Sequence, residues 1–102
     1  MSSTGDRKSK ADAERMLRHC VAHGIVQFIP HFYQRCSERG IGIQDVIGVL
    51  SRGFVYLEPE LDVRRNQWRC KVEGRTSEGE GLAVIVTFAD EDTTVVITAV
   101  SP

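Results

Sequence analysis

Residues 67–74 read QWRCKVEG and alternate between apolar and charged side chains. Trp68, Cys70 and Val72 fall on one side of this stretch, and the charged side chains fall on the other. A two-residue period is typical of a β-strand that buries one face and exposes the other. The stretch therefore predicts a sheet with an apolar face toward the core and a charged face toward solvent.

Two further segments toward the C-terminus have the composition of strands. Residues 82–88, LAVIVTF, are apolar at nearly every position, which predicts a central strand covered on both faces. After a tight acidic turn, residues 93–100, TTVVITAV, predict the last strand. Residues 54–57 are a candidate strand as well, whereas residues 58–66 have the composition of a loop. Together these segments predict an antiparallel meander of four strands.

The first half of the chain has a period of about 3.6 residues, which is typical of amphipathic helices. Helices are predicted over roughly residues 10–23, 31–39 and 43–52, each followed by a glycine suited to end it. The polar side of the first helix holds Glu14, Arg15, Arg18 and His19. A short strand is predicted at residues 25–29, closed by Pro30, which suits the first turn of the next helix. Helices grouped before strands predict an α+β fold, with N-terminal helices packed on one antiparallel sheet of about four strands.

The composition is that of a single soluble domain. The chain has 102 residues, 41% hydrophobic and 26% charged. We expect a flexible tail over residues 1–9 and one domain over residues 10–102. No apolar run approaches the roughly 18–20 residues that a membrane span needs. The first ten residues lack the apolar region of a secretory signal, so we expect a cytoplasmic protein with no membrane partner.

The cysteines and histidines give no sign of a metal site or a disulfide framework. Cys20, Cys36 and Cys70 form no C-x-x-C pair, and we expect three free, buried thiols. His19 and His23 are four residues apart, but no carboxylate lies at a matching spacing. We therefore expect no metal and no cofactor.

Charge is distributed unevenly along the chain, although the formal net charge is only −1. The basic residues between positions 63 and 75 are Arg64, Arg65, Arg69, Lys71 and Arg75, whereas residues 76–92 hold five acids and no base. Cations at alternate positions of a strand suit phosphate groups, which favours RNA as a ligand. The alternative is a solvated face balanced by the nearby acids. Tyr33, Tyr56 and Trp68 could stack on bases, but Trp68 falls on the apolar side of its strand.

A second basic group is predicted on the second helix. His31, Arg35 and Arg39 recur every fourth residue and so share one helix face. A histidine beside two guanidinium groups could move protons while the arginines hold a phosphate. In the alternative interpretation, His31 caps the helix and the arginines are solvated or paired with acids.

The string HFYQRCSERGIGIQDVIGVL, residues 31–50, resembles a known pattern, H-x-x-x-R-x-x-E-R-G-I-x-x-x-D-V-x-x-V-L. The pattern is that of a small bacterial domain family of unknown function, usually placed beside the RelE-like and BrnT-like toxins. The segments RCKVEGRTSEGEGLAVIVTF and TTVVITAV are similar to the strand–hairpin–strand ending of that family. The resemblance covers roughly residues 28–100. Two departures are Gly42, where the family usually has Ser or Thr, and a net charge that is slightly acidic where RelE-like ribonucleases are basic.

The resemblance implies a RelE-like fold and the toxin of a type II toxin–antitoxin module. Such a protein would be a metal-independent endoribonuclease with a cognate antitoxin, sometimes of the MqsA type, as its partner. The implied catalytic residues are His31, Arg35 and Arg69. The predicted RNA-binding residues are Arg39, Arg64, Arg65, Lys71 and Arg75, of which Arg64 and Arg65 follow from the charge distribution and not from the resemblance. The alternative function is a non-catalytic protein-binding module of the same fold.

Overall fold

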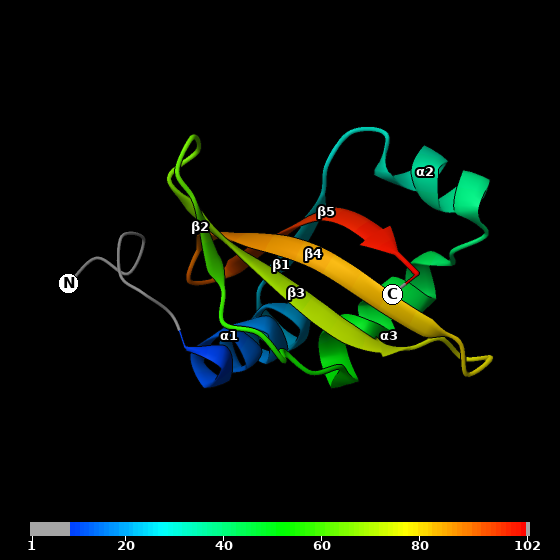
Figure 1. Cartoon of the computed structure of the whole chain (residues 1–102), viewed down its shortest axis with the longest axis horizontal. Coiled ribbons are helices and arrows are strands. Elements are labelled where there is room, and N and C mark those ends of the chain that lie inside the picture. Colours follow the sequence, from blue (N-terminus) through cyan, green and yellow to red (C-terminus); the bar gives the residue numbers. More distant parts are fainter. Residues whose placement is uncertain (1–8, 102) are drawn as a thin grey trace.

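The computed structural model describes residues 9–101, in which three helices pack on one five-stranded mixed sheet (Figure 1). The elements in chain order are α1 (Lys10–His23), β1 (Ile25–Phe28), α2 (Phe32–Arg39), α3 (Ile43–Arg52), β2 (Glu60–Asp62), β3 (Gln67–Arg75), β4 (Gly81–Asp90) and β5 (Thr93–Val100). The predicted α+β class is confirmed. Within the described residues, no helix is long and apolar enough to cross a membrane.

The sheet has the strand order β1-β5-β4-β3-β2, and its β1 edge is parallel to β5 while the other pairs are antiparallel. The prediction of an antiparallel sheet of about four strands is therefore wrong in the number of strands and in the direction of β1, which is parallel to its neighbour. The β-branched and aromatic composition of residues 25–29 predicts the strand β1 but says nothing about its partner. The partner is β5, which pairs with β1 from Ile25↔Thr93 to Phe28↔Val96. The predicted central position of residues 82–88 is confirmed, because β4 is third of five, although the helices cover only one face of the sheet.

The predicted strand at residues 54–57 is wrong, since only Phe54 forms an isolated bridge, with Glu73. The next residue directs its N–H elsewhere: Val55 donates to the Glu14 carboxylate at 2.8 Å. The strand forms instead at β2, inside the predicted loop. A turn over residues 63–66 contains Asn66 at φ 52°, a left-handed conformation that asparagine tolerates, and folds β3 back onto β2.

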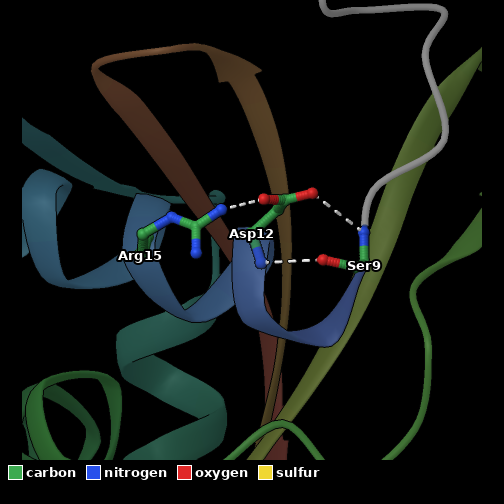
Figure 2. Close-up of polar contacts among 3 residues, drawn as sticks. All are labelled: Ser9, Asp12 and Arg15. Atoms are coloured by element: carbon green, nitrogen blue, oxygen red, sulfur yellow. Dashed lines mark hydrogen bonds and ion pairs between the residues drawn. The ribbon is translucent and has the colours of Figure 1, made fainter.

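The first helix begins with a capping box, which Figure 2 shows. The Ser9 hydroxyl accepts from the Asp12 N–H at 3.1 Å, and the Asp12 carboxylate accepts from the Ser9 N–H at 3.3 Å. Arg15 also pairs with Asp12. These bonds satisfy backbone donors that the first helical turn leaves open. Ser9 was expected in the tail but belongs to the helix start, while residues 1–8 of the predicted tail lie outside the described residues.

The second helix begins one residue later than the sequence predicts. His31 lies at its N-cap in a left-handed conformation, φ 70°, and its side chain makes no capping hydrogen bond. Pro30 therefore lies in the preceding turn and not in the first helical turn. This turn is closed by a bond from the Phe32 N–H to the Ile29 carbonyl at 3.1 Å.

The core lies between the inner face of the sheet and the helices. In Figure 1, α1 and α3 lie next to each other against the sheet, whereas α2 lies apart, beside β5. Fully buried side chains from the helices and strands include Leu17, Phe32, Val46, Leu50, Val72, Val84, Val86 and Val96. All three cysteines are free and buried, as predicted. Burial raises the pKa of each thiol above its ordinary value of 9.0, to about 12 for Cys70.

Candidate nucleic-acid interface

The alternation of β3 divides its side chains as the sequence predicts. Cys70 and Val72 are buried against the core. Arg69, Lys71 and Arg75 are exposed, and they occupy the odd positions that point to the opposite, open face of the sheet. The result is a row of three cations, interrupted by Glu73, that runs along one strand on a face that the helices leave uncovered.

The sheet register brings acids from β2 beside this row. Glu60 lies directly opposite Arg69, and the Oδ2 atom of Asp62 lies 3.4 Å from the Arg69 Nε atom. Since this ion pair uses Nε, the two terminal nitrogens of Arg69 are compatible with a bidentate phosphate contact. At the other end of β3, Arg75 donates to the Gly79 carbonyl at 2.9 Å and so braces the β3–β4 hairpin.

Arg64 and Arg65 lie in the exposed turn over residues 63–66 that joins β2 to β3. They extend the row of cations beyond the first residue of β3. We call Arg64, Arg65, Arg69, Lys71 and Arg75 the basic face.

The predicted group on α2 is only partly assembled. His31 and Arg35 are exposed neighbours at the helix start, and the Arg35 N–H donates to the His31 carbonyl at 3.0 Å. Arg39 instead reaches β5, where it donates to the Thr98 hydroxyl at 3.3 Å and to the Ala99 carbonyl at 2.7 Å. Because β1 pairs with β5 only as far as Val96, Arg39 binds the edge of β5 just past the end of β1. This contact gives Arg39 a structural role.

The strand order separates His31 from Arg69. Phe28 at the end of β1, Val96, Val86 and Cys70 form one row across the sheet. Neighbouring strands lie about 4.8 Å apart, so the end of β1 is on the order of 14 Å from β3. The structure thus places His31 and Arg35 one turn apart at the start of α2 but leaves both β5 and β4 between them and the basic face.

Glu14 and Arg18 have structural roles that the sequence does not predict, because their spacing places them on the solvent side of α1. Both are half-buried. Arg18 donates to the Leu50 carbonyl at 2.9 Å and to the Gly53 carbonyl at 2.5 Å, and Glu14 accepts from the Val55 N–H. They fix the segment that leaves α3. The only signal in the sequence is their i, i+4 spacing around Leu17.

That segment forms one wall of a groove beside β3. The groove encloses about 470 Å³ and is lined by residues that include Gly48, Arg52, Phe54, Tyr56, Gly74 and Arg75. We call it the β3 groove. Phe54 and Tyr56 are 55% and 59% exposed, with their ring centroids 6.0 Å apart.

The residues with metal-binding chemistry do not gather into a site in the described part of the chain, residues 9–101. The Nε2 atom of His19 lies 2.6 Å from Oδ1 of Asp92, in the β4–β5 turn. His23 stands beside it, with ring centroids 6.1 Å apart. His19 therefore attaches the end of α1 to the β4–β5 turn.

The fold and the basic face define a small α+β domain with an open, cationic sheet surface. Residues 28–101 match the family described as Domain of unknown function (DUF4258), and the chain belongs to that family. Comparison with the curated proteins and with the solved structures gives no match.

Proposed function

We propose that this domain binds RNA through the basic face and acts as the toxin of a type II toxin–antitoxin module. The observation that carries the proposal is the exposure of Arg69, Lys71 and Arg75 on one face of β3. Cations on alternate strand positions match the spacing of a bound, extended phosphate backbone and supply the sequence-independent part of RNA affinity. The toxin role rests on the resemblance to RelE-like proteins.

In this proposal, RNA cleavage is metal-independent and is assigned to His31 with Arg35. Cleavage at a ribose 2′-hydroxyl needs a proton acceptor, a proton donor and a stabilised phosphorane charge. An imidazole can serve both proton steps near neutral pH, and a guanidinium can hold the phosphate. Arg69 is assigned to RNA binding, because two strands separate it from His31.

The backbone of His31 supports a role for its side chain. A left-handed conformation at a residue other than glycine costs about 1 kcal/mol or more, and such residues cluster at functional sites. The His31 side chain is exposed and does not cap the helix, so capping offers no reason for a histidine there.

The second candidate function is a non-catalytic module that binds a partner protein, such as the antitoxin. The distance between His31 and the basic face favours it, as does the engagement of Arg39 with β5. Here the basic face neutralises an acidic partner, and no residue is catalytic.

Induced expression in a bacterial host, scored for growth and RNA integrity, separates the two candidates. The decisive variant is His31→Asn, since asparagine tolerates the left-handed conformation but cannot transfer protons. We expect RNA cleavage to fall by roughly 10²- to 10⁴-fold. His23→Asn, at an exposed histidine of α1, is the matched control and should cleave like wild type. Intact RNA in cells that express the wild type, or full cleavage by His31→Asn, would refute the catalytic assignment.

A further inference from the structure

We infer that the β3 groove holds one unstacked nucleotide of single-stranded RNA, with its base on Phe54 and Tyr56 and its phosphate on Arg52 and Arg75. The inference rests on the proposed RNA-binding function and names the form of RNA that the site accepts. The volume of about 470 Å³ lies within the range of small-ligand sites.

The aromatic wall has the character of a stacking platform. Phe54 and Tyr56 expose more than half of their surface, whereas Val55 between them is 4% exposed and anchors the segment in the core. Exposed aromatic rings with no place in the core are suited to base stacking, which tolerates any base because every base has a π face.

The wall is held in place from two sides. Phe54 exchanges both backbone hydrogen bonds with Glu73 of β3, at 2.8 and 2.9 Å. From the side of α1, the Glu14 carboxylate accepts from the Val55 N–H and Arg18 donates to the Gly53 carbonyl. A wall fixed before the ligand arrives loses little conformational entropy on binding.

Glycines let neighbouring groups pack closely along the floor of the groove. A Cβ atom at Gly48 would lie 2.8 Å from the Nη2 atom of Arg52, so the guanidinium of Arg52 lies across that glycine. At Gly74, a Cβ atom would lie 3.2 Å from the Val49 Cγ2 atom. A side chain at Gly48 would displace the guanidinium of Arg52, and one at Gly74 would crowd Val49.

The charge of the groove favours a phosphate. Arg52 and Arg75 line it together with one acid, Glu73. Arg75 uses one Nη1 bond for the Gly79 carbonyl, and a guanidinium has five donors in all. Lys71 lies two positions before Glu73 on the same side of β3. The groove is therefore continuous with the basic face.

The test measures binding of a fluorescein-labelled single-stranded RNA of about 12 nucleotides by fluorescence anisotropy, and compares it with a duplex of the same sequence. Phe54→Ala/Tyr56→Ala should weaken single-strand binding by about 5- to 100-fold, the loss typical of one stacked base. Ile25→Ala is the control, because Ile25 is a large apolar side chain of similar exposure, 52%, but lies on β1 at the opposite edge of the sheet.

Charge is tested in the same assay. Arg52→Gln and Arg75→Gln should each reduce the slope of log affinity against log salt by about 0.7, the value for one phosphate contact with a single strand. Arg15→Gln removes an exposed cation of α1 and should leave the slope unchanged.

The outcomes separate this site from the proposed function. Wild type that binds no RNA at low salt would overturn both. Wild type that binds RNA, with Phe54→Ala/Tyr56→Ala equal to it or with the duplex preferred, would overturn the groove alone. A measurement without variants adds a check: adenosine 5′-monophosphate should shift the amide NMR signals of Gly53, Gly74 and Gly81, and unshifted signals at saturating nucleotide would contradict the site.

Discussion

Cys70 shows how the position of one residue on a strand sets its chemistry. It lies on the buried face of β3, 2% exposed, and burial raises the pKa of its thiol from 9.0 to about 12. A thiol with so high a pKa holds almost no thiolate at neutral pH and reacts slowly. The prediction of inert, free cysteines could be made from sequence, because the two-residue period already places Cys70 beside Trp68 and Val72.

The raised pKa of Cys70 predicts a loss of stability at alkaline pH. The unfolded chain gives up this proton near its ordinary pKa of 9.0, and the folded chain only near 12, so the free energy of unfolding falls as pH rises above about 9. In Cys70→Ala the contribution is absent. Between about pH 8 and about pH 10, wild type should therefore lose about 1 kcal/mol more than Cys70→Ala, measured by chemical denaturation. Parallel pH profiles would contradict the assigned pKa.

Other residue-level features could not be read from the sequence. The left-handed conformation of His31 has no signature, because it depends on how the turn after β1 closes onto α2. Glu14 and Arg18 have the composition of a solvated helix face. Their carboxylate and guanidinium groups point inward because α3 ends beneath them and leaves unpaired backbone groups within reach.

At the scale of elements, α1 fastens the C-terminal end of α3. Arg18 donates to carbonyls at Leu50 and Gly53, where the last turn of a helix leaves its acceptors open. The same helix carries Arg15, which is 71% exposed and pairs with Asp12. Two arginines on one helix thus differ in role, because one reaches carbonyls at the end of α3 and the other pairs with an acid of its own helix.

This difference gives a stability prediction with an internal control. Arg18→Met should lower the free energy of unfolding by roughly 1.5–3 kcal/mol, because half-buried carbonyls lose a charged donor. Arg15→Met should cost less than about 1 kcal/mol, the usual worth of an exposed ion pair. Denaturant titration of both variants decides the point, and equal losses would mean that Arg18 does not hold the end of α3.

The type of an element was predictable where its hydrophobic period persisted. The prediction failed where a tertiary contact replaced the hydrogen bonds between neighbouring strands. The three helices and the strands β3, β4 and β5 follow the predicted segments closely. Residues 54–57 have the apolar composition of a strand, but Val55 bonds to Glu14 instead of to a neighbouring strand. The strand β2 has only three residues, too few for a period to be recognised.

At the scale of the whole molecule, strand order decides which candidate residues can act together. The sequence places His31 and Arg69 in two separate basic groups, and nothing in it reveals that β5 and β4 intervene. Likewise, the acids of β2 meet Arg69 only through the register Glu60↔Arg69. The part of the basic face on β3, Arg69, Lys71 and Arg75, was predictable, because it follows from alternation within a single strand.

The central claim is that the basic face binds RNA. The most direct measurement is the affinity of the full chain for single-stranded RNA across a salt series, for wild type and for Arg69→Gln/Lys71→Gln. The double variant should bind more weakly and lower the salt slope by about 1.4, the value for two phosphate contacts. Lys10→Gln/Arg15→Gln removes the same charge from α1 and should match wild type in slope. Wild type without measurable binding at about 50 mM salt, or a double variant with unchanged affinity and slope, would contradict the account.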